Sequence, residues 1–316
     1  MAINPYWGSD FFQFFYVLSQ RLVQWLTGKG GALASDEVQM LILIGIAISC
    51  SLIGTFLVVR KMTMMANSLS HTILIGIVLS TLFFSKQGAV LSLPVLLVSA
   101  FFTALITVGL SYLIGRSSYV KEDASIGLSF TTLFALGLVA LMLFAKNMHL
   151  GTEAVMGNLD AVHSDDLVLT WGVSLVDASI LCLGYPWLKA LSFDSQFASS
   201  IRLPVKTLDL LFLLLVAGTS IAAFRAVGVL IVLAFLTGPV IAARLLSDHL
   251  IKIISFSIGF GMAIAILAVA IARHILSVYQ TPLSTAGVAV ALIGVLFALA
   301  FLSTHFDFRR KECYPC

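Results

Sequence analysis

The sequence has few charged residues and no long polar stretch. Asp, Glu, Lys and Arg make up only 10% of its 316 residues, hydrophobic residues make up 60%, and the mean hydropathy is +1.07. Ordinary soluble domains are about 25% charged. Because no polar segment is long enough to form a separate soluble domain, the composition predicts an all-α, polytopic integral membrane protein. Residues 1–316 are expected to form a single transmembrane domain.

Several common motifs are missing. There is no G-x-x-x-x-G-K-[ST] sequence, so the chain is not expected to bind ATP through a P-loop. There is no H-E-x-x-H or G-x-S-x-G sequence, which disfavours a membrane protease or hydrolase. The Lys and Arg residues are scattered, which gives no support to nucleic-acid binding. The first fifteen residues lack a basic region and a small-residue cleavage site, so no cleaved signal peptide is expected.

Apolar segments of about 20 residues, the length that crosses a bilayer, recur along the chain. Nine spans are expected, at residues 38–59, 66–84, 91–114, 124–144, 167–187, 207–222, 227–246, 251–272 and 284–303. Residues 10–27 form either a tenth span or an amphipathic helix in the interface, because Arg21 and three glutamines interrupt their apolar residues.

The distribution of Lys and Arg predicts the orientation. Twelve of the eighteen fall on the side of the membrane that holds Arg60, and basic loops are typically cytoplasmic. Segment 188–206 and the tail 307–316 are therefore expected inside. Segment 188–206 is predicted to form a short amphipathic helix that begins near Asp194. Cys313 and Cys316 have the spacing of a redox or metal half-site, but in a frayed tail they are expected to be incidental.

Asn67 and His71 stand at the head of a predicted span and, four residues apart, share one helical face. Imidazole is a good ligand for zinc, manganese or iron, and an amide oxygen is a weaker one. Two ligands suit a transient stop in a transport pathway better than a structural metal centre. The alternative is a helix-start cluster in which Asn67 or Ser68 caps the helix.

Other polar residues are candidates with simpler alternatives. The outer loop 145–166 forms either a vestibule that attracts cations or a solvated acidic loop. Asp177, inside a span, is either functional or a hydrogen-bond anchor. Arg225 and Arg273 are expected to snorkel, with Arg225 in a tight turn. A break at Gly238-Pro239 is expected to border a pathway. The proposed vestibule residues are His149, Glu153, Asp160 and His163.

Five motifs, in order, resemble the membrane permease subunits of bacterial ABC importers for zinc, manganese and iron (the ABC-3 family). These permeases are distant relatives of the vitamin B12 and siderophore permeases. The resemblance extends from about Glu37 to Ser303. The motifs are GTFLVVRKMTMMANSLSHTILIG, KEDASIGLSF, AVMGN, FDSQFASSIRLPV and RAVGVLIVLAFLTGPVIAARLL.

The resemblance implies a multi-pass permease of the bacterial cytoplasmic (inner) membrane, with its C-terminus inside. Its expected partners are a second permease subunit, two cytoplasmic ATPases that hydrolyse ATP, an extracytoplasmic metal-binding protein and membrane lipid. No permanently bound cofactor is expected, and Zn, Mn or Fe(II) is the implied substrate. The implied coupling element spans Asp194–Leu203, with contacts from Asp194, Ser195, Gln196, Phe197, Ala198 and Arg202.

The resemblance also places the translocation path at Asn67 and His71. Many relatives have Asp at the position of Asn67, so a metal stop here is expected to be weaker. In a heterodimer, a partner permease would supply the missing carboxylate.

Three rival functions remain open from the sequence. A chelate permease, for a siderophore or cobalamin, would need a wide apolar path, whereas His71 favours a bare ion. A membrane enzyme would use His71 and Asp177 but has no second titratable residue at useful spacing. A secondary transporter would need more intramembrane carboxylates or an inverted repeat.

Overall fold

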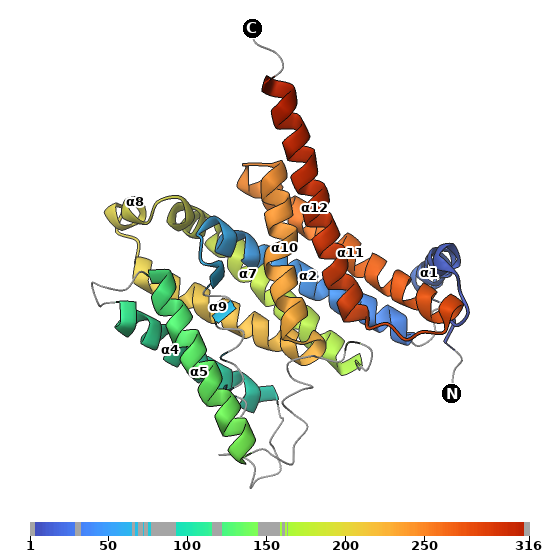
Figure 1. Ribbon diagram of the computed structural model, residues 1–316, viewed down its shortest axis with the longest axis horizontal. Helices are drawn as coiled ribbons and strands as arrows, with labels where there is room; N and C mark the ends of the chain where they lie inside the picture. The colour runs from blue at the N-terminus through green and yellow to red at the C-terminus, as the bar shows by residue number, and fades with distance from the viewer. Residues whose placement is uncertain are drawn as a thin grey trace.

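The computed structural model describes residues 4–28, 33–64, 67, 68, 72, 75, 76, 93–115, 122–144, 159, 162 and 164–312. Every regular element within these residues is a helix (Figure 1). The longer helices are α1 (Phe11–Leu26), α2 (Ser35–Val59), α4 (Leu93–Gly115), α5 (Glu122–Phe144), α7 (Ser164–Phe193), α9 (Val205–Val227), α10 (Val229–Leu246), α11 (Leu250–Tyr279) and α12 (Thr285–Glu312), and α8 (Ser195–Ser200) is a single short turn region.

The predicted helical membrane fold is confirmed. Eight of the nine predicted spans coincide with described helices, namely α2, α4, α5, α7, α9, α10, α11 and α12. Five stretches, in α2, α7, α9, α11 and α12, are long and apolar enough to cross a membrane, and shorter apolar helices lie in α4, α5 and α10. The remaining predicted span, 66–84, lies mostly outside the described residues.

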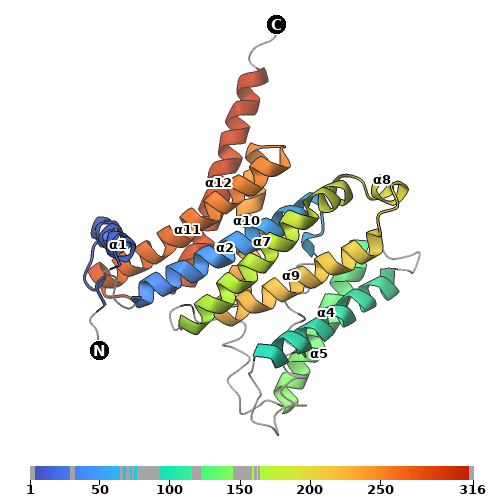
Figure 2. The same cartoon turned by 180° about the vertical axis from the view of Figure 1, so that it is seen from behind.

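Helix α2 is the centre of the bundle. It packs against α7, α10 and α11, and both views show it running between these helices (Figures 1 and 2). Within its apolar stretch, 83% of the residues are buried. A helix that is apolar on all sides lies in a protein core or is surrounded by lipid, and for α2 the neighbouring helices provide most of the cover. Helices α4 and α5 pair with each other beside α9.

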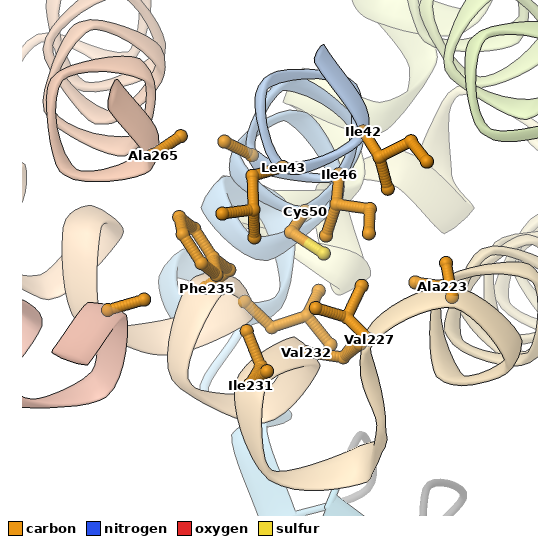
Figure 3. Packing of buried hydrophobic residues seen from close by; sticks show 14 of the residues in the cluster. Ile42, Leu43, Ile46, Cys50, Ala223, Val227, Ile231, Val232, Phe235 and Ala265 are labelled. Carbon is orange, nitrogen blue, oxygen red and sulfur yellow. The ribbon is translucent and has the colours of Figure 1, made fainter. Parts of the chain in front are cut away.

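The core between α2, α9 and α10 is built mainly from branched aliphatic side chains, with smaller and aromatic residues among them (Figure 3). Phe235 of α10 is fully buried and lies against the side chains of α2. Gly54 of α2 permits a close helix contact, because a Cβ there would lie 2.1 Å from the carbonyl oxygen of Leu236. Gly238 has the same role on α10, where a Cβ would lie 2.1 Å from Cγ2 of Ile293.

Two predicted helix irregularities are wrong. Helix α10 continues through Pro239 without a break. Proline removes only one backbone hydrogen bond of the helix, and packing against neighbouring helices keeps the remaining helical hydrogen bonds in place. Arg225 lies within α9 and not in a turn. The chain reverses at Gly228 alone, whose φ of +89° is a conformation that glycine adopts without strain.

The two ends of the bundle carry different elements. Helix α8 and the end of α2 lie at one end, and α1 lies at the other (Figures 1 and 2). The terminal part of α12 projects away from the bundle. Because α12 continues to Glu312, residues 307–312 of the predicted tail prolong a helix, whereas Cys313 and Cys316 lie outside the described residues.

Candidate metal pathway and coupling segment

The segment that follows α2 carries the predicted pathway residues and packs against α4. The hydroxyl oxygens of Thr72 and Thr107 of α4 lie 3.0 Å apart, and both residues are buried. A Cβ at Gly76 would lie 2.2 Å from Oγ1 of Thr103. The threonine hydroxyl groups and the missing side chain of Gly76 therefore allow this segment to lie close to α4.

The same segment contacts α5. A Cβ at Gly137 of α5 would lie 3.1 Å from the backbone nitrogen of Ile75. Asn67 is partly buried, and Ser68 is buried with a hydroxyl that has no hydrogen-bond partner in the part of the chain that the structure describes. His71 lies outside the described residues, so its predicted pairing with Asn67 stays a prediction.

The predicted outer vestibule lies almost entirely outside the described residues. This applies to all four of its proposed members, His149, Glu153, Asp160 and His163. Among the residues that are described, no three His, Cys, Asp or Glu side chains lie close enough to hold a metal ion. A site with three such ligands would therefore need residues outside the described ranges or from a second subunit.

Asp177 joins two spans through a buried hydrogen bond. It lies in the middle of α7, it is 1% exposed, and its carboxyl oxygens are 3.0 and 2.9 Å from the hydroxyl of Thr219 on α9. A groove of about 550 Å³ with mainly apolar walls opens beside the pair. No described Lys or Arg side chain forms an ion pair with Asp177. The described arrangement is a polar hydrogen-bond anchor between α7 and α9, whereas the pairing of Asp177 with His71 that the enzyme alternative needs lies outside the described residues.

The predicted helix start at Asp194 is confirmed. Its carboxylate oxygen accepts hydrogen bonds from the backbone nitrogens of Gln196, at 2.8 Å, and Phe197, at 3.1 Å. Asp is a favoured N-cap because it satisfies these otherwise free donors. The predicted cytoplasmic helix is shorter than expected, since residues 188–193 continue α7 and only Ser195–Ser200 form α8.

Helix α8 presents an exposed surface to the outside of the bundle. Gln196 and Phe197 are exposed, with Phe197 56% exposed, whereas Ala198 is fully buried against the bundle. Arg202 is also exposed and has a φ of +60°, which reverses the chain before α9. Ser195 is the first residue of α8. The exposed residues form a short projection from the bundle.

An ion pair joins the region after α8 to the end of α2. The guanidinium of Arg60, the C-cap residue of α2, bonds to the carboxylate of Asp209 in α9. It also lies 5.4 Å from the ring centroid of Phe212, a distance typical of cation–π contact. Arg244 of α10 donates to the carbonyl of Val58 at 3.1 Å. Two arginines therefore hold the end of α2 from two sides.

The guanidinium of Arg60 is not fully satisfied. Its side chain is 9% exposed, and Nη1 is buried without a hydrogen-bond partner among the described residues. The sequence predicted a role for Arg60 in topology and in the motif GTFLVVRKMTMMANSLSHTILIG, but not this pair, which joins positions 149 residues apart. A basic residue at the end of a span is an ordinary topology signal, so no local pattern distinguishes it.

Arg273, which is expected to snorkel, forms an ion pair within the bundle. Arg273 of α11 pairs with the buried Asp36 at the start of α2. Arg21 of α1 pairs with the neighbouring Glu37, with 2.8 Å between Nε and Oε1. Both acidic residues are nearly inaccessible, so these arginines neutralise buried charges.

Comparison with known protein families identifies the family to which this helical bundle belongs. A sequence model described as the ABC 3 transport family matches residues 37–304, which is most of the chain. The chain belongs to the ABC 3 transport family. It is therefore a membrane permease of the ABC metal-importer type, as the sequence resemblance predicted.

Named relatives agree with this assignment. The permease is 39% identical over 317 aligned residues to a probable metal transport system membrane protein of Chlamydia muridarum, covering 98% of this chain and 99% of that protein. It is 34% identical to the manganese transport system membrane protein MntD of Bacillus subtilis, covering 81% of this chain and 88% of that protein. It is 32% identical to the zinc transport system membrane protein TroD of Treponema pallidum, covering 83% and 72%.

Solved structures share the fold of this ABC 3 permease. PsaBC from Streptococcus pneumoniae in complex with Fab superposes with a TM-score of 0.73 at 22% identity, covering 90% of this chain and 95% of that chain. A metal-chelate type ABC transporter in an inward-facing conformation gives a TM-score of 0.62 at 17% identity, covering 84% and 85%. The predicted likeness to metal-chelate type permeases is thus confirmed at the level of fold.

Proposed function

We propose that this ABC 3 permease carries a divalent transition metal ion across the bacterial cytoplasmic membrane, driven by ATP hydrolysis on separate subunits. The observation that carries the proposal is the extended similarity to membrane proteins named for manganese and zinc transport. Mn²⁺ and Zn²⁺ are accordingly the first cargoes to test, followed by Fe(II). The metal is the substrate, and no permanently bound cofactor is proposed.

The proposed partners follow from the division of labour in ABC transporters. The permease would pair with a second permease subunit, bind two cytoplasmic ATPases and receive its metal from an extracytoplasmic binding protein. Exposed Gln196, Phe197 and Arg202 support α8 as the ATPase contact, because they project from the bundle while Ala198 anchors the helix. This assignment puts α8 and the C-terminus on the cytoplasmic side.

The proposed path runs past Asn67 and His71. Packing of the neighbouring residues between α4 and α5 supports this, since the segment lies inside the protein and contains hydroxyl and amide groups. A neutral amide at position 67 binds a cation more weakly than a carboxylate. We therefore expect a second, different permease subunit to supply a carboxylate. Full uptake by a homodimer of this chain would contradict the heterodimer.

Transmission from α8 to the path is proposed to pass through Arg60. Helix α9 is the next helix after α8, Asp209 lies in its second turn, and Arg60 precedes Asn67 by seven residues. Movement of α8 would displace α9, and the ion pair would carry that displacement to the end of α2. Alternating access of this kind requires rigid connections between moving elements.

The deciding experiment is metal uptake into proteoliposomes that contain the permease, its partner subunit and the ATPases. Uptake of Zn²⁺, Mn²⁺ and Fe(II), free and chelated, would be compared with and without ATP. The variants are His71→Ala and, as a matched control, His249→Ala, which removes an exposed histidine at the N-cap of α11. We expect ATP-dependent uptake of the free ion that is lost only in His71→Ala.

Other results would reject specific parts of the proposal. Uptake without ATP would reject the ATP-driven mechanism. ATP-driven uptake that does not depend on His71 would keep the importer and reject the path. Uptake of the chelate in preference to the free ion would favour the chelate permease, whose fold this chain also shares.

A further inference from the structure

Helix α1 has an exposed apolar stripe. Spacings of four and three residues place its members on one face. Phe12 is 85% exposed, Tyr16 64%, Val23 59% and Leu26 87%. Ser19 is the polar position within the stripe, and its hydroxyl donates to the carbonyl of Tyr16 at 2.8 Å. Apart from the Tyr16 hydroxyl and Ser19, whose hydroxyl is satisfied within the helix, the stripe is apolar along its length.

A second exposed stripe on α1 is polar and uncharged. Gln13, Gln20 and Gln24 are all exposed, and spacings of seven and four residues place them together on another face. The one charged residue of α1, Arg21, pairs with the buried Glu37. The exposed surface of α1 is thus divided into an apolar side and a neutral polar side.

The third face of α1 fixes the helix to the bundle. Phe14 is buried against Tyr6, with ring centroids 4.9 Å apart. The Tyr6 hydroxyl donates to Glu37 at 3.0 Å, and the backbone nitrogen of Phe11 donates to Nδ1 of His274 at 3.1 Å. Burial, together with the bond to Glu37, raises the pKa of Tyr6, so the phenol remains a donor at physiological pH. These contacts hold α1 in one rotational setting.

The orientation of α1 differs from that of the helices it contacts. In Figure 1 it is seen nearly end-on, while α2 and α11 run across the picture. It therefore lies across their ends, on the side opposite α8. Its 16 residues measure about 24 Å along the helix axis, less than the roughly 30 Å of the hydrocarbon core.

We propose that α1 lies in the plane of the membrane interface, at the end of the bundle opposite α8. The stripe of Phe12, Tyr16, Val23 and Leu26 contacts the acyl chains of that leaflet, and the glutamine stripe faces water. Segregated apolar and polar faces are characteristic of interfacial helices, and Tyr and Trp residues such as Trp25 prefer this depth. The family match begins at Glu37, so α1 is an addition to the part that the ABC 3 family defines.

The composition of α1 identifies the physical basis of the lipid contact. Its exposed faces carry no Lys or Arg, so attraction to anionic headgroups has no part in it. Burial of apolar side chains drives the contact instead. Binding of α1 to the membrane is therefore expected to be the same in neutral and in anionic lipid.

The test uses the two exposed stripes as matched probes. Single cysteines would replace Phe12, Tyr16 and Val23 in one set and Gln13, Gln20 and Gln24 in the other, within the full chain. The background would lack the four native cysteines and keep the thermal midpoint of the wild type. Each nitroxide-labelled protein would be reconstituted in neutral and in anionic liposomes, and its collision rates with oxygen and with a water-soluble nickel complex would be measured.

The expected pattern is high oxygen and low nickel accessibility along the apolar stripe, with the reverse along the glutamine stripe, in both kinds of liposome. Nickel accessibility along both stripes would overturn the proposal by placing α1 in water. Low accessibility of the apolar stripe to both reagents would overturn it by showing that protein covers the stripe. A pattern seen only in anionic lipid would contradict the apolar basis. None of these measurements involves transport, so they are independent of the proposed function.

Discussion

Replacing Arg60 by Met tests whether the ion pair with Asp209 links α8 to the transport path. The substitution removes the charge but keeps an unbranched side chain of similar reach. Removing one partner of a fully buried pair costs about 3–5 kcal/mol, and an exposed pair contributes about 0–1 kcal/mol. Arg60 is 9% exposed and Asp209 34%, so the pair lies between these limits.

Two other contributions act in opposite directions. Loss of the contact with Phe212 removes about 0.5–2 kcal/mol. Nη1 of Arg60 is buried without a hydrogen-bond partner among the described residues, which is unfavourable. Its removal therefore stabilises the protein by an amount similar to the loss of the Phe212 contact. We therefore expect Arg60→Met to weaken the link by about 2 kcal/mol, which corresponds to about thirty-fold in an equilibrium constant.

The assay measures ATP hydrolysis and metal uptake in the same proteoliposomes. If the pair transmits movement, Arg60→Met lowers the metal ions transported per ATP while hydrolysis continues. Lys61→Asn is the matched control, because it removes the adjacent basic charge at an exposed position whose φ of +59° asparagine tolerates. It should leave the ratio unchanged.

The reasoning is refuted if Arg60→Met transports as many ions per ATP as the wild type. It is also refuted if hydrolysis and uptake fall in parallel, because the number of metal ions transported per ATP is then unchanged. Arg60→Lys should transport fewer metal ions per ATP than the wild type and more than Arg60→Met. Lysine keeps the charge but lacks the planar guanidinium group that binds a carboxylate through two nitrogens.

Substitutions at three further positions, with Gly109→Ala as a control, test local contacts. Gly54→Ala should destabilise the solubilised protein by about 2 kcal/mol in thermal unfolding, because the new methyl group meets backbone; Gly109→Ala, with open space around it, should not. Asp177→Asn should have the thermal stability of the wild type, because the amide oxygen can still accept from Thr219. Asp177→Leu should lower the free energy of unfolding by about 1–3 kcal/mol, because the bond to Thr219 is lost. If both variants change the stability equally, Asp177 is not a hydrogen-bond anchor. Asp194→Ala should weaken the start of α8 by about 1 kcal/mol and lower uptake per ATP, and unaffected coupling would contradict the role of α8.

The positions of the spans could be predicted because lipid imposes a local requirement. A spanning helix must satisfy its own backbone and present apolar side chains over about 20 residues. That signal is contained within each segment, which explains why α2, α9 and α11 appeared where hydropathy predicted them. The start of α8 was equally local, since Asp194 caps donors only two and three residues away.

The predicted irregularities failed because tertiary packing overrides a local preference. Gly238 and Pro239 are a strong local signal for a break, yet Gly238 fits closely against Ile293 of α12 and the helix continues. For α9 and α10, hydropathy placed the turn near Arg225, but the charged residue is accommodated within the helix and Gly228 makes the turn.

The sequence by itself determined that the chain is a helical membrane permease, since composition, span length and ordered family motifs are properties of contiguous residues. Only the tertiary structure decided the partners of its charges: Arg60 with Asp209, Asp177 with Thr219, and Arg273 with Asp36. A buried polar group must find a partner, but many residues qualify chemically. The fold decides which of them come within bonding distance. The contacts that place α1 across the end of the bundle likewise join residues far apart in the sequence.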